Sequence, residues 1–294
     1  MDKPSDIRAP DTSPLWDFFP LIMCINLRER TDRFEEAKGE FARVGIRQVV
    51  FYQSEKMADR DKAIIDAHMA CLRYAVEKNV PYVLVFEDDA LFVEKYEIHL
   101  PHAIEFLRSR SDWNLFHFGG FIFRKAERVT PHIIRGALLN VHAVVVRTEF
   151  AKKILEKRPY CSGMSVDLFY SALNGDSSFV YVDPLICIQR PSASDGSWDK
   201  LSKNKEGWLG NAMIYTSLGW RERLRFHHFS YLERFRIHNG ITFFKVYRPI
   251  LRRRLAKAEA LSRQGQVPVI DEKANGTFTV LELQGNPAES AYSG

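Results

Sequence analysis

The chain has 294 residues, of which 46% are hydrophobic and 27% charged, and its formal net charge is +5. This composition excludes a disordered or fibrous protein, and the length suffices to bury a large core as one α/β domain with an appendage or as two small domains. The longest early apolar stretch, residues 18–27, contains a proline, is too short to cross a membrane and follows an acidic start unlike that of a secretory signal.

The four cysteines do not form a recognisable metal or redox motif. They contain no C-x-x-C pair and have no nearby histidine at zinc-ligand spacing, and three of the four lie in apolar runs: Cys24, Cys71, Cys161 and Cys187. We therefore expect buried, reduced thiols, which favours a cytoplasmic location.

Strand-like and helix-like segments alternate along the first two-thirds of the chain. The apolar and β-branched runs predict strands at residues 21–25, 48–52, 82–86, 114–118, 137–146 and 179–182. Helical spacing predicts helices after Asp32, which we expect to be the N-cap, over about 59–78 and 99–108, after a capping Thr148, and from Ser165. This alternation predicts an α/β domain whose Rossmann-type, mostly parallel sheet is flanked by helices.

An acidic triplet, Glu87-Asp88-Asp89, ends the apolar run at residues 82–86. In open α/β sheets, ligands bind beyond the carboxyl ends of the strands. Three adjacent carboxylates repel one another unless a cation is present, and Mg²⁺ and Mn²⁺ prefer such hard oxygen ligands. The triplet therefore predicts a metal-bound phosphate site; the alternative is a solvated acidic turn.

Side chains alternate along an extended segment, so Glu87 and Asp89 are expected to share one face while Asp88 points to the other. We assign Asp89 to the metal and Glu87 to the metal or to a ribose. Asp88 either contributes to the same site or orients neighbouring backbone.

The composition changes near residue 192, and the chain divides into five predicted segments. Residues 219–263 hold twelve Lys or Arg against three Glu, a net charge of +9 that exceeds that of the whole chain. We predict a flexible N-terminal segment at 1–17, a catalytic domain at 18–196, a loop or lid at 197–218, a basic helical appendage at 219–263 and a polar tail at 264–294 with a strand-like run at 278–283.

The order of several motifs resembles glycosyltransferase family 25, which contains lipooligosaccharide and collagen sugar transferases. The residues that carry the resemblance span roughly 20–196: Ile25-Asn26-Leu27, Arg30, Asp32-Arg33, His68, Glu87-Asp88-Asp89-Ala90, Trp113 to Phe116 with Gly119, Ala151 to Leu155, Val166 to Leu168, and Pro184 to Gln189 with Ser194-Asp195. The resemblance implies a GT-A fold, a nucleotide-sugar donor that is usually UDP-galactose or UDP-glucose, a divalent metal, and transfer with inversion. The chain departs from the family at Asn140-Val141-His142, where a Gly and a Tyr are usual, and the basic segment lies outside the pattern.

The predicted donor site draws on several strand-end loops. We expect the backbone of Ile25, Asn26 and Leu27 to cradle the base, and Arg30 or Arg33 to meet ribose or phosphate. Arg33 has the alternative of a solvated first-turn residue, and His68 is either a core histidine or support for the donor or metal. The residues Gln189, Ser194 and Asp195 either contact the donor or metal or merely form a turn.

Inverting transfer needs a general base to take the proton of the acceptor hydroxyl. Asp167 is the candidate, and its alternative role is to stabilise the first turn of a helix through the helix dipole.

The sequence therefore predicts a hexosyltransferase that depends on Mn²⁺ or Mg²⁺ and moves galactose or glucose to a glycan, lipooligosaccharide or protein hydroxyl. The basic segment 219–263 would dock it on an anionic surface, such as the inner face of a membrane. The alternative is a catalytically idle protein of the same fold whose basic segment binds nucleic acid or an anionic surface. No recognised nucleic-acid motif occurs in that segment, so we do not expect nucleic acid as a partner.

Overall fold

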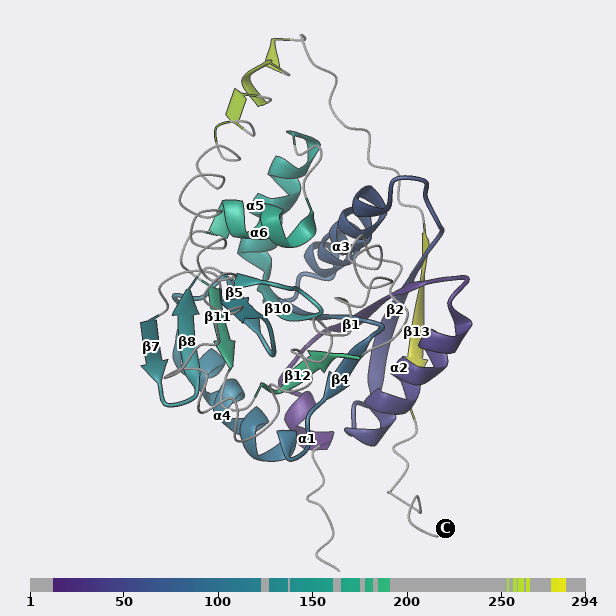
Figure 1. The fold of residues 1–294 in the computed structure, drawn as a ribbon, viewed down its shortest axis with the longest axis vertical. Helices are drawn as coiled ribbons and strands as arrows, with labels where there is room; N and C mark the ends of the chain where they lie inside the picture. The colour runs from purple at the N-terminus through teal and green to yellow at the C-terminus, as the bar shows by residue number, and fades with distance from the viewer. Residues whose placement is uncertain are drawn as a thin grey trace, which may run out of the picture.

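The computed structural model describes residues 13–122, 127–136, 138–160, 165–174, 178–181, 185–190 and 276–283, with isolated positions between 253 and 264. Nine strands form one sheet in the order β13-β2-β1-β3-β10-β5-β11-β8-β7 (Figure 1). Their bounds are β1 Ile22–Leu27, β2 Gln48–Ser54, β3 Tyr82–Glu87, β5 Leu115–His117, β7 Glu127–Thr130, β8 Ile133–Gly136, β10 Ala143–Arg147, β11 Ser178–Tyr181 and β13 Gly276–Glu282.

The sheet is mixed. β1 runs parallel to its neighbours β2 and β3, and β11 runs parallel to β5. The remaining ladders, including the two that β10 makes with β3 and β5, are antiparallel. Two short ribbons accompany the sheet: β4 (Ala90–Phe92) pairs with β12 (Cys187–Gln189), and β6 (Phe121–Ile122) pairs with β9 (Leu138–Leu139).

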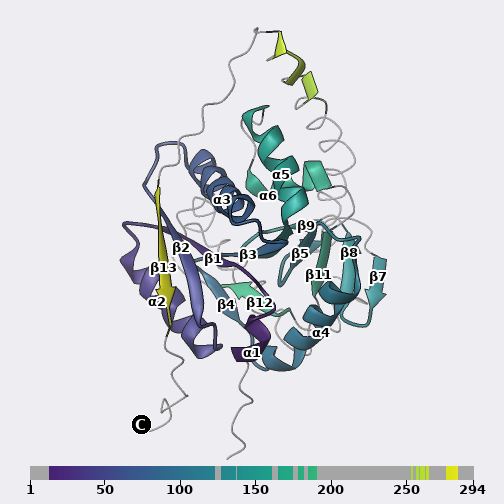
Figure 2. The same ribbon diagram turned by 180° about the vertical axis from the view of Figure 1, so that it is seen from behind.

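Helices cover both faces of the sheet, which confirms the predicted α/β architecture (Figures 1 and 2). One face carries α1 (Ser13–Trp16), α2 (Thr31–Arg43) and α4 (Tyr96–Ser109). The other carries α3 (Arg60–Glu77), α5 (Thr148–Lys157) with the 3₁₀ turn η1 (Arg158–Tyr160), and α6 (Val166–Asn174). In β3, Leu84 and Phe86 enter the first core while Val83 and Val85 enter the second. Burial on both faces explains the continuous apolar run of this strand.

Two helix starts differ from their predicted caps. The N-cap of α2 is Arg30, whose side chain makes no capping hydrogen bond, and Asp32 lies in the first turn instead. Thr148 is the first residue of α5, and its hydroxyl donates to the carbonyl of Val80 rather than capping the helix. By contrast, Asp59 caps α3 by accepting from the backbone N–H of Lys62 at 3.0 Å, and this helix has the predicted extent.

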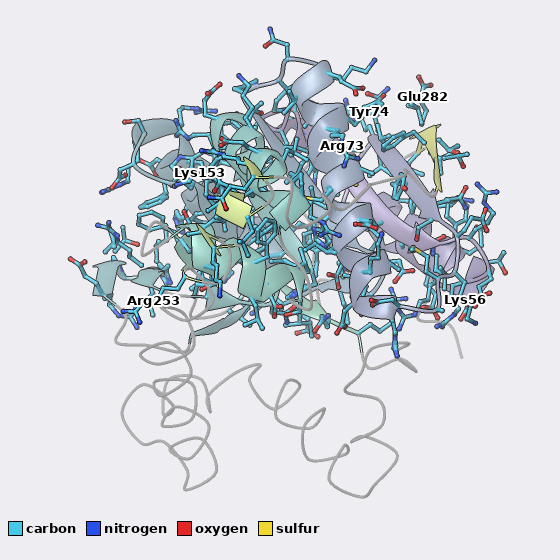
Figure 3. The ribbon with its side chains drawn as sticks, turned by 90° about the horizontal axis from the view of Figure 1, so that it is seen from above. Lys56, Arg73, Tyr74, Lys153, Arg253 and Glu282 are labelled. Carbon is cyan, nitrogen blue, oxygen red and sulfur yellow. The ribbon has the colours of Figure 1, made fainter. Side chains whose placement is uncertain are left out.

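The N-terminal end of the described chain is more ordered than predicted, and the strand-like run predicted at 278–283 forms a strand. Trp16, placed by sequence in a flexible segment 1–17, is 3% exposed, and its Nε1 donates to the carbonyl of Val44 at 2.7 Å. Within the predicted polar tail 264–294, residues 276–282 form β13, which pairs antiparallel with β2. Phe278 of β13 packs on Tyr52 and on Tyr74 of α3, with ring centroids 4.9 and 4.6 Å apart; Figure 3 labels Tyr74 and Glu282, the last residue of β13. The sheet therefore recruits an apolar strand that lies far along the chain.

The predicted strand at 137–146 is broken at Asn140, whose backbone is left-handed with φ of 78°. Asparagine is among the few residues that tolerate this conformation. The break separates β9 from β10 and brings the carbonyl of His142 to the backbone N–H of Glu87, at 2.8 Å.

Several sequence expectations concern residues outside the described ranges: the lid at 197–218, nearly all of the basic segment 219–263, and Cys161. Cys24, Cys71 and Cys187 are buried free thiols, as predicted. Across the part of the chain that is described, no helix combines the length and apolar content needed to cross a bilayer.

The β4–β12 ribbon is fastened to the end of β5 by a close backbone approach at Gly119. The carbonyl of Phe118 accepts from the backbone N–H groups of Ile186 and Cys187, at 2.9 and 3.1 Å. A Cβ on Gly119 would lie 1.9 Å from the carbonyl oxygen of Cys187. Glycine is therefore required here because only a residue without a side chain permits β12 to approach this closely.

Gly119→Ala is expected to destabilise the protein by about 1–3 kcal/mol, because the clash is with backbone that cannot move aside without shifting β12. The matched control is Gly39→Ala in α2, where an added Cβ meets nothing within 4 Å. That change is expected to stabilise the protein by about 0.5–1 kcal/mol, since alanine favours a helix interior. Denaturant unfolding of the two variants measures both effects, and equal effects would contradict the steric account.

Candidate active site

The three carboxylates lie together at the carboxyl end of β3, in the middle of the sheet. Glu87 is the last residue of the strand and pairs in register with Ile25 of β1, and Asp88 and Asp89 form the turn into β4. Asp88 and Asp89 are only 6% and 9% exposed. The alternative of a solvated acidic turn is therefore wrong, and each buried charge needs compensation.

The carboxylate of Asp88 receives hydrogen bonds from residues of β1 and α2. Its Oδ2 accepts from Nδ2 of Asn26 at 2.8 Å, and its Oδ1 accepts from Nη1 of Arg33 at 3.0 Å. Arg33 is 8% exposed, which rules out its alternative as a solvated residue. Asn26, predicted to act through its backbone, thus also acts through its side chain, which bonds the carbonyl of Arg30 at 3.2 Å as well.

The carboxylate of Glu87 is contacted by residues of α3 and β12. Its Oε1 lies 3.3 Å from Nε2 of His68, and its Oε2 lies 3.5 Å from Nε2 of Gln189. Burial raises the pKa of Glu87, but the hydrogen bond and charge of His68, helped by His142 and Arg33, outweigh burial and lower the pKa below its ordinary value. His68 is thus buried, as a core histidine would be, and it also contacts Glu87 at the site.

Asp89 is the least compensated of the three. Its Oδ2 is 4.0 Å from Nη1 of Arg33, and its Oδ1 is buried without a hydrogen-bond partner among the described residues. Burial, and then the charges of Glu87 and Asp88, raise the pKa of Asp89 to about 8. The face-sharing argument for Glu87 and Asp89 does not hold, because the extended segment ends at Glu87 and Arg33 lies beside both aspartates.

Asp167 lies in the first turn of α6. Its Oδ1 accepts from the hydroxyl of Ser165 and from the backbone N–H of Leu168, the latter at 3.0 Å. α6 packs against α3, and Tyr170, one turn after Asp167, meets the ring of His68 edge-on with centroids 5.9 Å apart. Asp167 therefore lies one turn before Tyr170 and on the same side of the helix, and the contact with the site is made by Tyr170 through His68.

The remaining predicted residues divide into three groups. Gln189 joins the site through Glu87, and Ile25 and Leu27 lie on β1 beside it. Arg30 is engaged locally with Asp32, at 2.9 Å between Nε and Oδ1. Ser194 and Asp195 lie outside the described residues.

Sequence reasoning missed four residues around Glu87, which the structure brings in from β5, α6 and the β9–β10 connection: His117, Asn140, His142 and Tyr170. The signal for two of them was the departure from the family pattern at 140–142. Nothing local in the sequence shows that this segment pairs with the end of β3.

Unpartnered polar atoms gather around the triplet. Besides Asp89 Oδ1, the buried atoms without a hydrogen-bond partner in the described ranges include Asn26 Oδ1, His68 Nδ1, His142 Nδ1 and the Tyr170 hydroxyl. Such atoms are costly unless water or a ligand satisfies them. No three His, Cys, Asp or Glu side chains of the described chain converge as a ready-made metal centre. Two of these buried atoms, Asn26 Oδ1 and Asp89 Oδ1, are acceptors, which a hydrogen-bond donor or a cation would satisfy.

Asp89→Asn is expected to stabilise the metal-free protein increasingly as the pH rises from about 4 to about 8. Over this range the folded state keeps a proton on Asp89 that the unfolded chain, with an ordinary Asp pKa of about 3.9, has released. The wild type therefore loses stability with rising pH, whereas the asparagine variant lacks this contribution. Thermal unfolding of both proteins in EDTA between pH 4 and pH 9 tests the expectation.

The matched control is Asp32→Asn. The hydrogen bond from Arg30 lowers the pKa of Asp32 to about 2, so its carboxylate stabilises the fold above the unfolded pKa, and its loss has the opposite sign. A difference between wild type and Asp89→Asn that stays constant across the pH range would contradict the burial account.

Three comparisons with known proteins bear on the identity of the chain. Residues 36–135 match the family described as Glycosyltransferase family 25 (LPS biosynthesis protein), a region that contains His68 and the acidic triplet. A comparison with curated proteins found no match.

Two solved structures are similar. One is a glycosyltransferase involved in the glycosylation of the major capsid of PBCV-1, with 13% identity over 56% of this chain and 92% of that chain and a TM-score of 0.34. The other is A197 from STIV, with 10% identity over 58% of this chain and 94% of that chain and a TM-score of 0.37. The family match over residues 36–135 agrees with the resemblance seen in the sequence and supports an assignment to glycosyltransferase family 25.

Proposed function

We propose that the protein transfers a hexose, galactose or glucose, from a UDP-linked donor to a hydroxyl of a glycan or lipooligosaccharide acceptor, with inversion and with a divalent metal. The observation that supports this most strongly is the Oδ1 of Asp89, which is buried without a hydrogen-bond partner among the described residues, beside two further carboxylates at the end of β3 in the region that matches glycosyltransferase family 25. The match to that family favours this function over a catalytically idle binding protein.

The residues fit a divalent cation, although no complete set of protein ligands is preformed. Mg²⁺ is usually bound through one or two carboxylates together with substrate phosphates, and it keeps several waters. Asp89 offers a free carboxylate oxygen, and Glu87 lies next to it in the same cluster. When bound, Mn²⁺ or Mg²⁺ would supply Lewis-acid neutralisation of the diphosphate leaving group.

The chain's own residues account for the rest of donor binding. Arg33 and Asn26 fix Asp88, so they hold the turn that presents Asp89. Arg33, within 4.0 Å of Asp89, places a positive charge where a diphosphate carries negative charge. The strand end at Ile25 to Leu27 remains the proposed cradle for the base.

Asp167 is the proposed general base. Both of its hydrogen bonds to described residues are made by Oδ1, which leaves Oδ2 to take a proton. The hydroxyl of Ser165 and the N–H of Leu168 hold the carboxylate in place at the start of α6. In this assignment the acceptor oxygen attacks the anomeric carbon as its proton passes to Asp167, and the nucleoside diphosphate leaves from the opposite face.

Removal of metal is expected to abolish activity through Asp89. Wild-type protein should release UDP slowly from UDP-galactose or UDP-glucose in Mn²⁺, and EDTA or Asp89→Ala should each reduce this release by at least roughly 10², because the leaving group then lacks charge neutralisation. Coupled detection of UDP measures the rate, and Asp32→Ala is a carboxylate control outside the cluster. Near wild-type release by Asp89→Ala, or insensitivity to EDTA, would overturn the metal assignment.

Asp167→Asn is expected to lower donor hydrolysis by roughly 10² while donor affinity changes little, because the amide keeps the shape but cannot accept the proton. Water stands in for the acceptor hydroxyl in this assay, and calorimetry gives the donor affinity. Glu149→Gln, in the first turn of α5, controls for the loss of a helix N-terminal carboxylate. Equal losses of rate and affinity in Asp167→Asn would reduce Asp167 to a binding or structural residue.

A further inference from the structure

A second layer of side chains contacts Glu87 through Gln189. Nδ2 of Asn140 donates to Oε1 of Gln189 at 3.0 Å, and Nε2 of Gln189 faces Oε2 of Glu87 at 3.5 Å. Asn140 thus reaches Glu87 through one intervening amide. It holds a left-handed backbone, with φ of 78°, in the short connection between β9 and β10.

Hydrogen-bond chemistry determines which end of the Gln189 side-chain amide faces Glu87 and which faces Asn140. A carboxylate only accepts hydrogen bonds, so Gln189 must turn its NH₂ group toward Glu87 and its oxygen away. That oxygen then needs a donor, and the NH₂ group of Asn140 supplies it. If the Gln189 amide were reversed, its oxygen would face the Glu87 carboxylate and its NH₂ group would face that of Asn140, so both contacts would become repulsive.

The backbone on either side of Asn140 is anchored to the same surroundings. The carbonyl of Asn140 accepts from Nδ1 of His117 at 3.0 Å, and Nε2 of His142 donates to the carbonyl of Cys187 at 3.3 Å. Burial lowers the pKa of His117 to about 4, so this histidine stays neutral at physiological pH. The carbonyl of His142 also receives the backbone N–H of Glu87, at 2.8 Å. Asn140 is therefore held against the site by contacts that do not involve its own side chain.

We propose that Asn140 is a positioning residue for the transfer reaction: through Gln189 it orients the Glu87 carboxylate toward the bound donor. The inference rests on the proposed function, because it needs a donor at the Glu87–Asp89 cluster. Residues in such outer positions orient the groups that contact substrate or metal, and their loss commonly costs 10- to 100-fold in affinity or activity.

The test is a double-mutant cycle on donor hydrolysis. Asn140→Gly keeps the positive φ and removes only the amide, and Gln189→Ala removes the group through which Asn140 acts. The two single variants and the double variant are assayed with UDP-galactose and UDP-glucose in Mn²⁺, with kcat and KM determined separately. Asn79→Gly is the matched control, because Asn79 also has a positive φ, of 53°, but lies exposed beyond the end of α3.

Asn140→Gly is expected to lower kcat/KM roughly tenfold in the wild-type background and less than about twofold in the Gln189→Ala background. Asn140→Asp is expected to be worse than Asn140→Gly, since the new carboxylate attracts the Gln189 NH₂ group and turns the amide oxygen toward Glu87. Asn79→Gly should keep the wild-type value, and thermal unfolding should show all variants folded at the assay temperature.

Additive losses in the cycle, or a wild-type value for Asn140→Gly, would overturn the positioning role while leaving the proposed function in place. A wild-type protein that releases UDP from neither donor would overturn the proposed function and this inference with it. The two failures are therefore distinguishable from the wild-type assay alone.

Discussion

Three successive carboxylates lie where β3 ends, with Asp88 and Asp89 buried and Glu87 half-buried, and the surrounding residues offset the cost of that burial. A buried charge is stable only when opposite charge or hydrogen-bond donors replace the lost water. Asp88 receives Arg33 and Asn26, and Glu87 receives His68 and Gln189. Asp89 receives no hydrogen bond at its buried Oδ1 from the described residues, and burial raises its pKa to about 8. Among the described residues, Asp89 is therefore the carboxylate of the three whose charge is least compensated.

The compensating groups come from four elements that are far apart in the sequence. Asn26 lies on β1, Arg33 on α2, His68 on α3 and Gln189 on β12. The first three are brought together by the parallel β2-β1-β3 core and its crossover helices. Gln189 arrives differently, on the β4–β12 ribbon, which approaches β5 closely enough to require Gly119. The electrostatics of the site therefore depend on the packing of the fold as a whole.

The features that depend on local sequence, such as the strand before the triplet and the helix after Asp59, were predicted from the sequence. The apolar run before the triplet, and the periodicity of residues 59–78, defined β3 and α3 closely, and the same apolar run correctly placed the triplet at the carboxyl end of a strand. The partners of each carboxylate were not predictable, because they depend on which strands neighbour β3. The antiparallel insertion of β10 between β3 and β5, and the left-handed break at Asn140 that precedes it, have no local signature beyond one unusual tripeptide. The capping error at Thr148 has the same cause, since its hydroxyl donates to the distant carbonyl of Val80, whereas Asp32 is engaged by a local partner, Arg30.

We propose that the uncompensated carboxylate of Asp89 binds a divalent ion together with a nucleoside diphosphate. Titration of Mn²⁺ into the protein with UDP present, followed by the loss of the electron paramagnetic resonance signal of free Mn²⁺, tests it most directly. The account predicts one bound Mn²⁺ per wild-type chain, tighter with UDP than without it, and no such binding by Asp89→Ala. Equal Mn²⁺ binding by the two proteins, or binding that UDP does not strengthen, would contradict it.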